Sequence, residues 1–276
     1  MIIDAHQHFW YYDPTTHAWI DDSMSSIRKD FTPSDLQNVY EQNHIDGCVT
    51  VQVDQTETET MTLVENAKQY SFIKGIVGWV DLRSAEINER LEFFAQFPMV
   101  KGFRHIVQAE PPDFLYNEDF RRGISFLQQY DYTYDILVYP HQLKAATEFA
   151  AAFPEQKFVL DHLAKPYIKK QLIDDWKKDL NQLAAFDNAW CKISGMVTEA
   201  DWHNHSYNDF APYMEAALEA FGIDRIMFGS DWPVCLLADS YENVLSIVTE
   251  FFKSFSKQEK EKVFALNAIQ FYNLNL

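Results

Sequence analysis

The feature that most constrains the fold is an alternation of short apolar segments with helix-like segments, repeated eight times along the chain. Eight such repeats predict parallel strands that are joined by right-handed helical crossovers. An open doubly wound sheet is the rival fold, but it typically has fewer strands, and no G-x-G-x-x-G or P-loop follows the first apolar segment. We therefore expect an α/β fold, a closed (β/α)8 TIM barrel. The apolar segments begin at Ile2 and then lie at residues 45–53, 73–80, 100–107, 133–139, 157–162, 190–195 and 225–231.

The length fits one such barrel, because (β/α)8 domains have about 250 residues and this chain has 276. No linker rich in Pro, Gly or Ser interrupts the repeats, so residues 1–276 are predicted to form a single domain. After a polar and aromatic segment at residues 11–30, Thr32 and Pro33 predict the start of the first helix. Later helices are expected at residues 56–70, 172–186, 207–221, 241–252 and 257–272.

The overall charge limits the classes of partner. The formal charge is −18, with 41 acidic and 23 basic residues, so the protein's field repels phosphate backbones and nucleic acid is not an expected partner. The sequence shows no basic segment followed by an apolar one at its start and no apolar run of membrane-spanning length. These observations predict a cytoplasmic protein without membrane contact.

Three widely spaced cysteines, Cys48, Cys191 and Cys235, are interpreted as small buried apolar side chains.

Polar residues at the ends of the predicted strands mark the candidate site. Side chains two apart on a strand share a face, so His6 and His8 project side by side. His162 and Asp231 follow the sixth and eighth apolar segments, and the carboxyl ends of barrel strands converge on one mouth. The four side chains can bind a metal or stabilise a developing oxyanion. The alternative is that the histidines are hydrogen-bonded core residues and that Asp231 is only a helix N-cap.

Five motifs resemble those of the amidohydrolase-related TIM-barrel family, and within it they are most similar to the sugar lactonase branch of the L-fuconolactonase and L-rhamnonolactonase type. The motifs occur in order over nearly the whole chain, at residues 4–10, 102–105, 160–166, 194–202 and 228–233. The resemblance implies a TIM-barrel hydrolase that acts on a small molecule.

The resemblance also implies a ligand set for one divalent metal ion: His6, His8, His162 and Asp231. Three imidazoles and one carboxylate suit Zn²⁺ best. A second metal is not expected, since the fourth strand carries Arg104 where binuclear relatives have a carboxylated lysine. The branch is also similar to enzymes that work without metal, in which histidines polarise the carbonyl. In either case Asp231 is the expected base that activates water.

Five further residues are predicted to bind substrate. Arg104 is a bidentate donor suited to a carboxylate or to vicinal hydroxyls, or else forms an ion pair with Asp135 or Asp161. Lys192 either hydrogen-bonds substrate hydroxyls or pairs with Glu199 or Asp161. The three aromatic residues expected nearest the ligand are Trp10, Trp202 and Trp232.

The favoured function is hydrolysis of an aldonolactone such as L-fucono-, L-rhamnono- or L-galactonolactone. The first alternative is a metal-dependent decarboxylase of an aromatic acid, since relatives of that kind share the barrel and the paired histidines. The second is a binding protein without catalysis, against which the intact set of three histidines and Asp231 argues. Barrels of this kind commonly form homo-oligomers, but no surface of this sequence indicates one.

Overall fold

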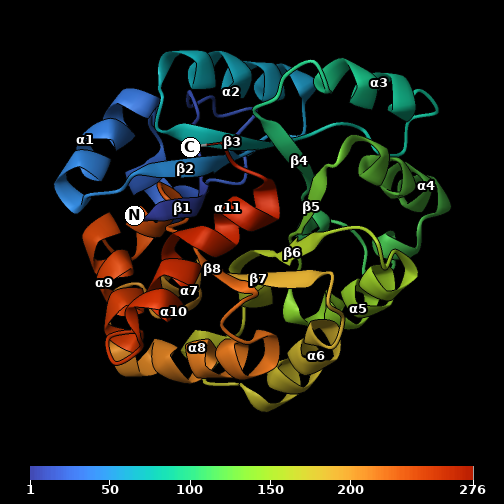
Figure 1. Cartoon of the computed structure of the whole chain (residues 1–276). Coiled ribbons are helices and arrows are strands. Elements are labelled where there is room, and N and C mark those ends of the chain that lie inside the picture. The colour runs from blue at the N-terminus through green and yellow to red at the C-terminus, as the bar shows by residue number, and fades with distance from the viewer. Residues whose placement is uncertain (276) are drawn as a thin grey trace.

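A computed structural model describes residues 1–275, in which eight parallel strands form one sheet in the order β1 to β8, with helices around it (Figure 1). The predicted (β/α)8 barrel is thus confirmed. The strands are β1 (Ile3–Gln7), β2 (Gly47–Val51), β3 (Ile73–Gly78), β4 (Val100–His105), β5 (Thr133–Ile136), β6 (Phe158–Leu160), β7 (Ala189–Ile193) and β8 (Ile226–Phe228).

The helices alternate with the strands, and their bounds agree closely with the pattern of the sequence. They are α1 (Pro33–Asn43), α2 (Glu57–Gln69), α3 (Ile87–Phe94), α4 (Glu118–Leu127), α5 (Leu143–Ala152), α6 (Asp174–Ala184), α7 (Met196–Glu199), α8 (Tyr207–Phe221), α9 (Tyr241–Phe251), α10 (Lys257–Glu261) and α11 (Asn267–Tyr272). The predicted helix at residues 257–272 is divided by a π-helical turn, Lys262–Leu266.

Local sequence explains how the first helix begins. Pro33 occupies its first turn, where a missing N–H is harmless, and the Asp35 carboxylate accepts the backbone N–H of Thr32 at 2.8 Å. The segment before it, predicted as a loop, contains a short 3₁₀ helix, Asp22–Ile27.

One layer of the barrel interior is apolar, and the C-terminal helix covers that end of the barrel. Ile3, Val49, Val159 and Met227 project inward from four strands, and Phe271 of α11 packs against this layer. Figure 1 shows α11 lying across the ring of strands. Because α11 covers one end, access to the interior is left to the opposite end, where the strands terminate.

Backbone hydrogen bonds close the sheet between its first and last strands. The Asp231 N–H donates to the His6 carbonyl at 2.8 Å, and the His8 N–H donates to the Trp232 carbonyl at 2.7 Å. The same bonds fix the segment after β8 beside the end of β1, so Asp231 must lie next to the paired histidines. None of the helices in residues 1–275 combines the length and apolarity needed to span a bilayer.

Candidate active site

Three histidines and Asp231 meet where the barrel closes. The Nε2 atoms of the histidines surround Oδ1 of Asp231, which lies 3.3 Å from His8 Nε2 and 3.8 Å from both His6 Nε2 and His162 Nε2. Each of the four residues is at most 4% exposed. The structure therefore brings together the residues that the sequence singled out, and they come from the ends of β1, β6 and β8.

The far side of each imidazole is held by a fixed partner. His8 Nδ1 lies 2.8 Å from the Val51 carbonyl, and His162 Nδ1 lies 2.9 Å from Ser194 Oγ. A carbonyl can only accept, so Nδ1 of His8 carries the hydrogen, and the same assignment fits His162 if the Ser194 hydroxyl accepts. Their Nε2 lone pairs then face Asp231. Burial lowers the pKa of His162 well below its usual value, which favours the neutral imidazole.

His6 has the same arrangement. Arg104 Nη1 lies 3.3 Å from His6 Nε2, and a guanidinium can only donate, so this nitrogen also holds a lone pair. The ring hydrogen is then on Nδ1, which can donate it to Asp161 Oδ1 at 3.2 Å, and the Lys192 ammonium, 3.1 Å from the same nitrogen, directs its own hydrogens to the two carboxylates it pairs with. Burial lowers the pKa of His6 well below its usual value. All three imidazoles thus direct a lone pair towards the same carboxylate oxygen.

These atoms suit a divalent cation. Nε2 of His6 and Nε2 of His8 are only 3.1 Å apart, and Oδ1 of Asp231 lies within 4.8 Å of both. Lone pairs and a carboxylate repel one another at such distances unless a cation lies between them. In a tetrahedral Zn²⁺ site, ligand atoms about 2.0–2.1 Å from the metal lie about 3.3 Å from one another. The donor atoms of His6, His8 and Asp231 therefore fit one such ion, and His162 Nε2 lies beside them, 3.8 Å from Asp231 Oδ1. Each of the three histidines also has a hydrogen-bond partner for its other ring nitrogen, as histidines that bind metals usually do.

The backbone at two of these residues is in the left-handed region. His162 has φ +53° and Asp231 has φ +58°, conformations that are strained for residues with a side chain. Gly195, at φ +62°, lies against the His162 ring, and a Cβ at this position would be 2.5 Å from His162 Nδ1. The Ser194-Gly195 pair thus both bonds His162 and leaves room for its ring.

Beneath the histidines lies a buried ionic network. Arg104 Nη1 lies 3.0 Å from Asp161 Oδ2, and Lys192 Nζ lies 2.5 Å from Asp135 Oδ2 and 3.0 Å from Asp161 Oδ1. Tyr272 of α11 donates to Asp135 at 2.8 Å. Burial would raise the pKa of Asp161, but the Lys192 ammonium and the other nearby groups hold it well below its usual range.

This network changes the interpretation of Lys192. Its side chain is fully buried and also lies 3.1 Å from His6 Nδ1, so it is placed below the site and does not line the cavity above. Of the two sequence-based alternatives, the pairing with Asp161 is the one present, and Asp135 is a partner that the sequence did not indicate. Arg104 likewise pairs with Asp161, but it also reaches the cavity.

A cavity of about 330 Å³ opens over Asp231. Trp10, Trp202 and Trp232, expected near the ligand, do not line it. Trp10 donates to the Lys29 carbonyl, Trp202 donates to the Thr198 carbonyl, and Trp232 packs edge-on against Phe31. Trp19 is the tryptophan that lines it. The lining residues are His8, Trp19, Val53, Gln55, Arg104, Ile106, Gln108, Ala109, Leu137, His162, Lys165, Asp231 and Val234.

One ion pair beside the cavity was missed by the sequence analysis. Lys165 Nζ lies 3.5 Å from Glu199 Oε1, and both side chains are only partly exposed, at 17% and 21%. Burial raises the pKa of Glu199. The position of Lys165 directly before Pro166, in the segment that follows His162, was the only signal in the sequence that could have indicated it.

The comparisons agree with this geometry. A model of the amidohydrolase family matches residues 3–274. The chain is 37% identical to L-fucono-1,5-lactonase of Burkholderia multivorans, over 99% of this chain and 96% of that protein. It is 32% identical to L-fucono-1,5-lactonase of Burkholderia ambifaria, again over 99% and 96%. A crystal structure of a Burkholderia multivorans amidohydrolase with bound zinc superposes with a TM-score of 0.97 at 37% identity, and each chain is covered completely.

Proposed function

Because the chain belongs to the amidohydrolase family, we propose that it is a hydrolase that opens the lactone ring of a sugar acid of the L-fucono-1,5-lactone type. The observation that carries this proposal is the convergence of three imidazole nitrogens and the Asp231 carboxylate at the floor of one cavity. The cavity volume of about 330 Å³ is at the lower end of the range for small-molecule sites and suits a single sugar ring.

Asp231 is the proposed base. It removes a proton from a water molecule as the water oxygen attacks the lactone carbonyl, and it returns that proton to the ring oxygen when the acyl C–O bond breaks. The product is a hydroxy acid that ionises in solution. The pKa of Asp231 lies below its usual range although burial alone would raise it, so the group is an ionised carboxylate that can accept a proton.

The carbonyl oxygen gains negative charge during this attack and needs positive partners. A divalent ion held by His6, His8, His162 and Asp231 would polarise the carbonyl as a Lewis acid. Arg104 supplies a permanent charge at the same wall of the cavity, and its Nε has no hydrogen-bond partner among the described residues although it is buried. We propose that this N–H donates to the substrate.

Substrate hydroxyls need separate partners. Lys165 lines the cavity and is already oriented by Glu199, so we assign it the hydroxyl-binding role that the sequence suggested for Lys192. Trp19 offers the apolar face against which the C–H side of a sugar ring can pack. Trp10, Trp202 and Trp232 then stabilise the loops that surround the cavity.

A pH-indicator assay with purified protein tests the proposal. We expect acid release from L-fucono-1,5-lactone well above the rate in a protein-free blank, and slower release from L-rhamnono-γ-lactone. Dialysis against a chelator should lower the rate, and added Zn²⁺ should restore it if the ion is required. Failure of both lactones would contradict the proposal, and CO₂ release from a dihydroxybenzoate would establish the decarboxylase alternative instead.

A further inference from the structure

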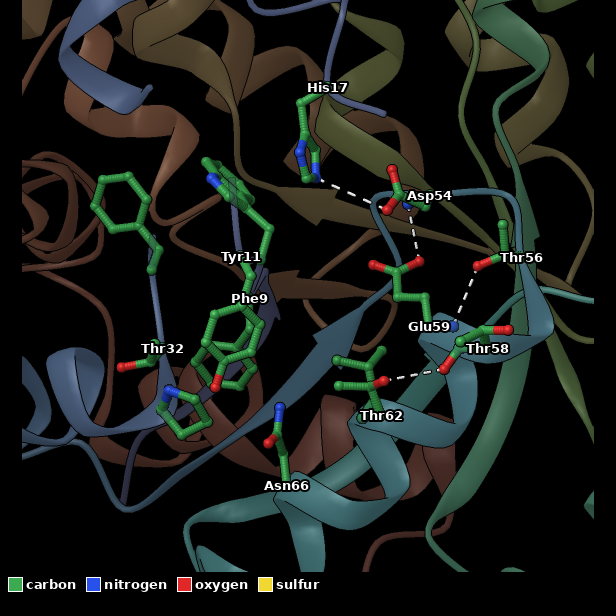
Figure 2. A pocket seen from close by; sticks show the side chains of 14 residues that line it. Phe9, Tyr11, His17, Thr32, Asp54, Thr56, Thr58, Glu59, Thr62 and Asn66 are labelled. Carbon is green, nitrogen blue, oxygen red and sulfur yellow. Dashed lines mark hydrogen bonds and ion pairs between the residues drawn. The ribbon is translucent and has the colours of Figure 1, made fainter. Parts of the chain in front are cut away.

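A second cavity, of about 210 Å³, lies beside the catalytic one. It opens between the segment after β1 and helix α2, and among the described residues it shares no lining residue with the catalytic cavity. Figure 2 shows Thr62 and Asn66 projecting from α2 on one side and Phe9 and Tyr11 on the other. The hydrolysis proposed above uses none of these side chains, so the cavity requires its own explanation.

A buried histidine in this cavity has a donor with no partner. His17 is 3% exposed, and the Asp13 backbone N–H donates to its Nδ1 at 3.0 Å. Nδ1 also lies 3.2 Å from the Asp13 carbonyl, but that carbonyl already accepts the His17 backbone N–H at 2.8 Å. The shorter contact, from the Asp13 N–H, therefore makes Nδ1 an acceptor and places the hydrogen of the neutral ring on Nε2. This Nε2 has no hydrogen-bond partner among residues 1–275. Buried polar groups usually have a hydrogen-bond partner, so this donor, which faces a cavity, needs one from outside the chain.

The distance from His17 to the nearest carboxylate defines that group. Nε2 of His17 and Oδ2 of Asp54 are 3.8 Å apart, which is too far for a direct hydrogen bond (Figure 2). One oxygen atom about 2.8 Å from each can bridge them. It must accept a hydrogen bond from His17 and donate one to Asp54. A hydroxyl does both, whereas an ammonium cannot accept, and a carboxylate or phosphate cannot donate.

The remaining surface of the cavity also favours an uncharged hydroxylated ligand. Thr58, Thr62 and Asn66 are spaced four apart on α2 and so present two hydroxyls and an amide along one face. The Tyr11 ring, which is 61% exposed, supplies an apolar surface against which C–H groups can pack. Among the described residues the lining contains no Lys or Arg, and the Asp54 carboxylate disfavours an anion.

The volume restricts the ligand to about one ring. About 210 Å³ corresponds to roughly seven water molecules at ~30 Å³ each, and it is below the roughly 300–1,000 Å³ of typical drug-sized sites. We propose that this cavity is a second binding site for an uncharged monosaccharide-sized polyol, one hydroxyl of which bridges His17 Nε2 and Asp54 Oδ2. Asp54 lies between Val53 and Gln55, which line the catalytic cavity, so the two sites share one loop.

The test uses L-fucose, an uncharged hexose that contains no ester and cannot be hydrolysed. In an NMR titration of the full-length protein, the Trp10 indole N–H and the amides of residues 56–66 should shift and saturate. Thr62→Trp, which fills the cavity from an exposed helix position, should weaken this binding about tenfold or more, as should Asp54→Ala. Lys68→Trp, on the same helix but outside the cavity, should bind within about twofold of the wild type.

Circular dichroism and the thermal midpoint establish that each variant is folded. If Thr62→Trp does not fold, Asp54→Ala still tests the proposal. Three results would overturn the proposal. The first is an absence of saturable shifts, which would mean that only water bridges His17 and Asp54. The second is L-fucose shifts confined to residues of the catalytic cavity, such as Trp19 and Gln55. The third is saturation by ethylammonium but not by L-fucose. None of these results bears on lactone hydrolysis, because the proposal does not depend on that activity.

Discussion

Replacement of Lys192 by methionine distinguishes a structural from a substrate-binding role of this residue. The change keeps the length of the side chain but removes an ammonium that lies 2.5 Å from Asp135 and 3.0 Å from Asp161 in a fully buried environment. Burial raises the pKa of Asp135 to about 6, so both carboxylates are ionised at pH 7.5. In the variant only Arg104 remains to compensate them, and it bonds Asp161 alone.

The expected loss of stability follows from this geometry. Removal of one partner from a buried ion pair typically costs about 3–5 kcal/mol, because an uncompensated charge stays in the interior. For domains of about 150–250 residues, each kcal/mol lost from the free energy of unfolding lowers the thermal midpoint by roughly 2–4 °C. A decrease of ~6–20 °C is therefore expected for this slightly longer chain. Thermal unfolding at pH 7.5, followed by circular dichroism at one scan rate, measures it. Lys253→Met, which removes an exposed ion pair, should change the stability by at most about 0.5 kcal/mol.

A second variant identifies the cause. In Lys192→Met/Asp135→Asn, the charge that Lys192→Met leaves uncompensated is removed, while the amide oxygen can still accept the Tyr272 hydroxyl. The double variant should therefore unfold at a higher temperature than Lys192→Met alone. The reasoning is refuted if Lys192→Met unfolds within about 1 kcal/mol of the wild type. A raised KM with unchanged stability would instead support the sequence-based prediction that Lys192 binds substrate.

Two further predictions concern Ser194 and Glu59. Ser194→Ala removes the partner of His162 Nδ1, and a loss of about 10–100-fold in Zn²⁺ affinity or kcat is expected; an unchanged affinity in competition with a chromophoric chelator, together with an unchanged kcat, would contradict it. Burial raises the pKa of Glu59 to about 8, although its carboxylate accepts the N–H groups of Val53 and Asp54. The folded protein then keeps this proton up to about pH 8, while the unfolded chain releases it near 4.5. Stability should therefore fall between these pH values, by at most about 1.4 kcal/mol per pH unit. Glu59→Gln should remove this part of the pH dependence, which unfolding at pH 5.5 and 8.5 measures, and an identical slope in the variant would show that Glu59 does not cause it.

The sequence predicted the barrel and the group around Asp231 for the same physical reason. Alternation along β1 places His6 and His8 on one face, and closure of an eight-stranded sheet brings the last strand beside the first. Both facts can be read from residue order alone. The assembly of His6, His8 and Asp231 therefore required no knowledge of loop packing.

The depth of a side chain in the barrel could not be predicted in this way. Alternation indicates that Lys192 points inward, but its layer depends on the stagger of neighbouring strands, and its partner Asp135 lies on β5, two strands away in the sheet. Which tryptophan lies at the cavity could not be predicted for a different reason. Trp10 is fixed by a contact with Phe31, far along a loop, and Trp19 takes the place at the cavity that was expected for Trp10. Such loop contacts leave no periodic signal in the sequence.

The most direct test of the proposed chemistry is the turnover of L-fucono-1,5-lactone by Asp231→Asn. The amide has nearly the same shape as the carboxylate but cannot accept the water's proton, so kcat should fall by about 10²–10⁴-fold. Asp22→Asn, at a fully exposed carboxylate, is the matched control and should leave kcat unchanged. A folded Asp231→Asn protein whose kcat stays within about tenfold of the wild type would contradict the assignment of Asp231 as the base.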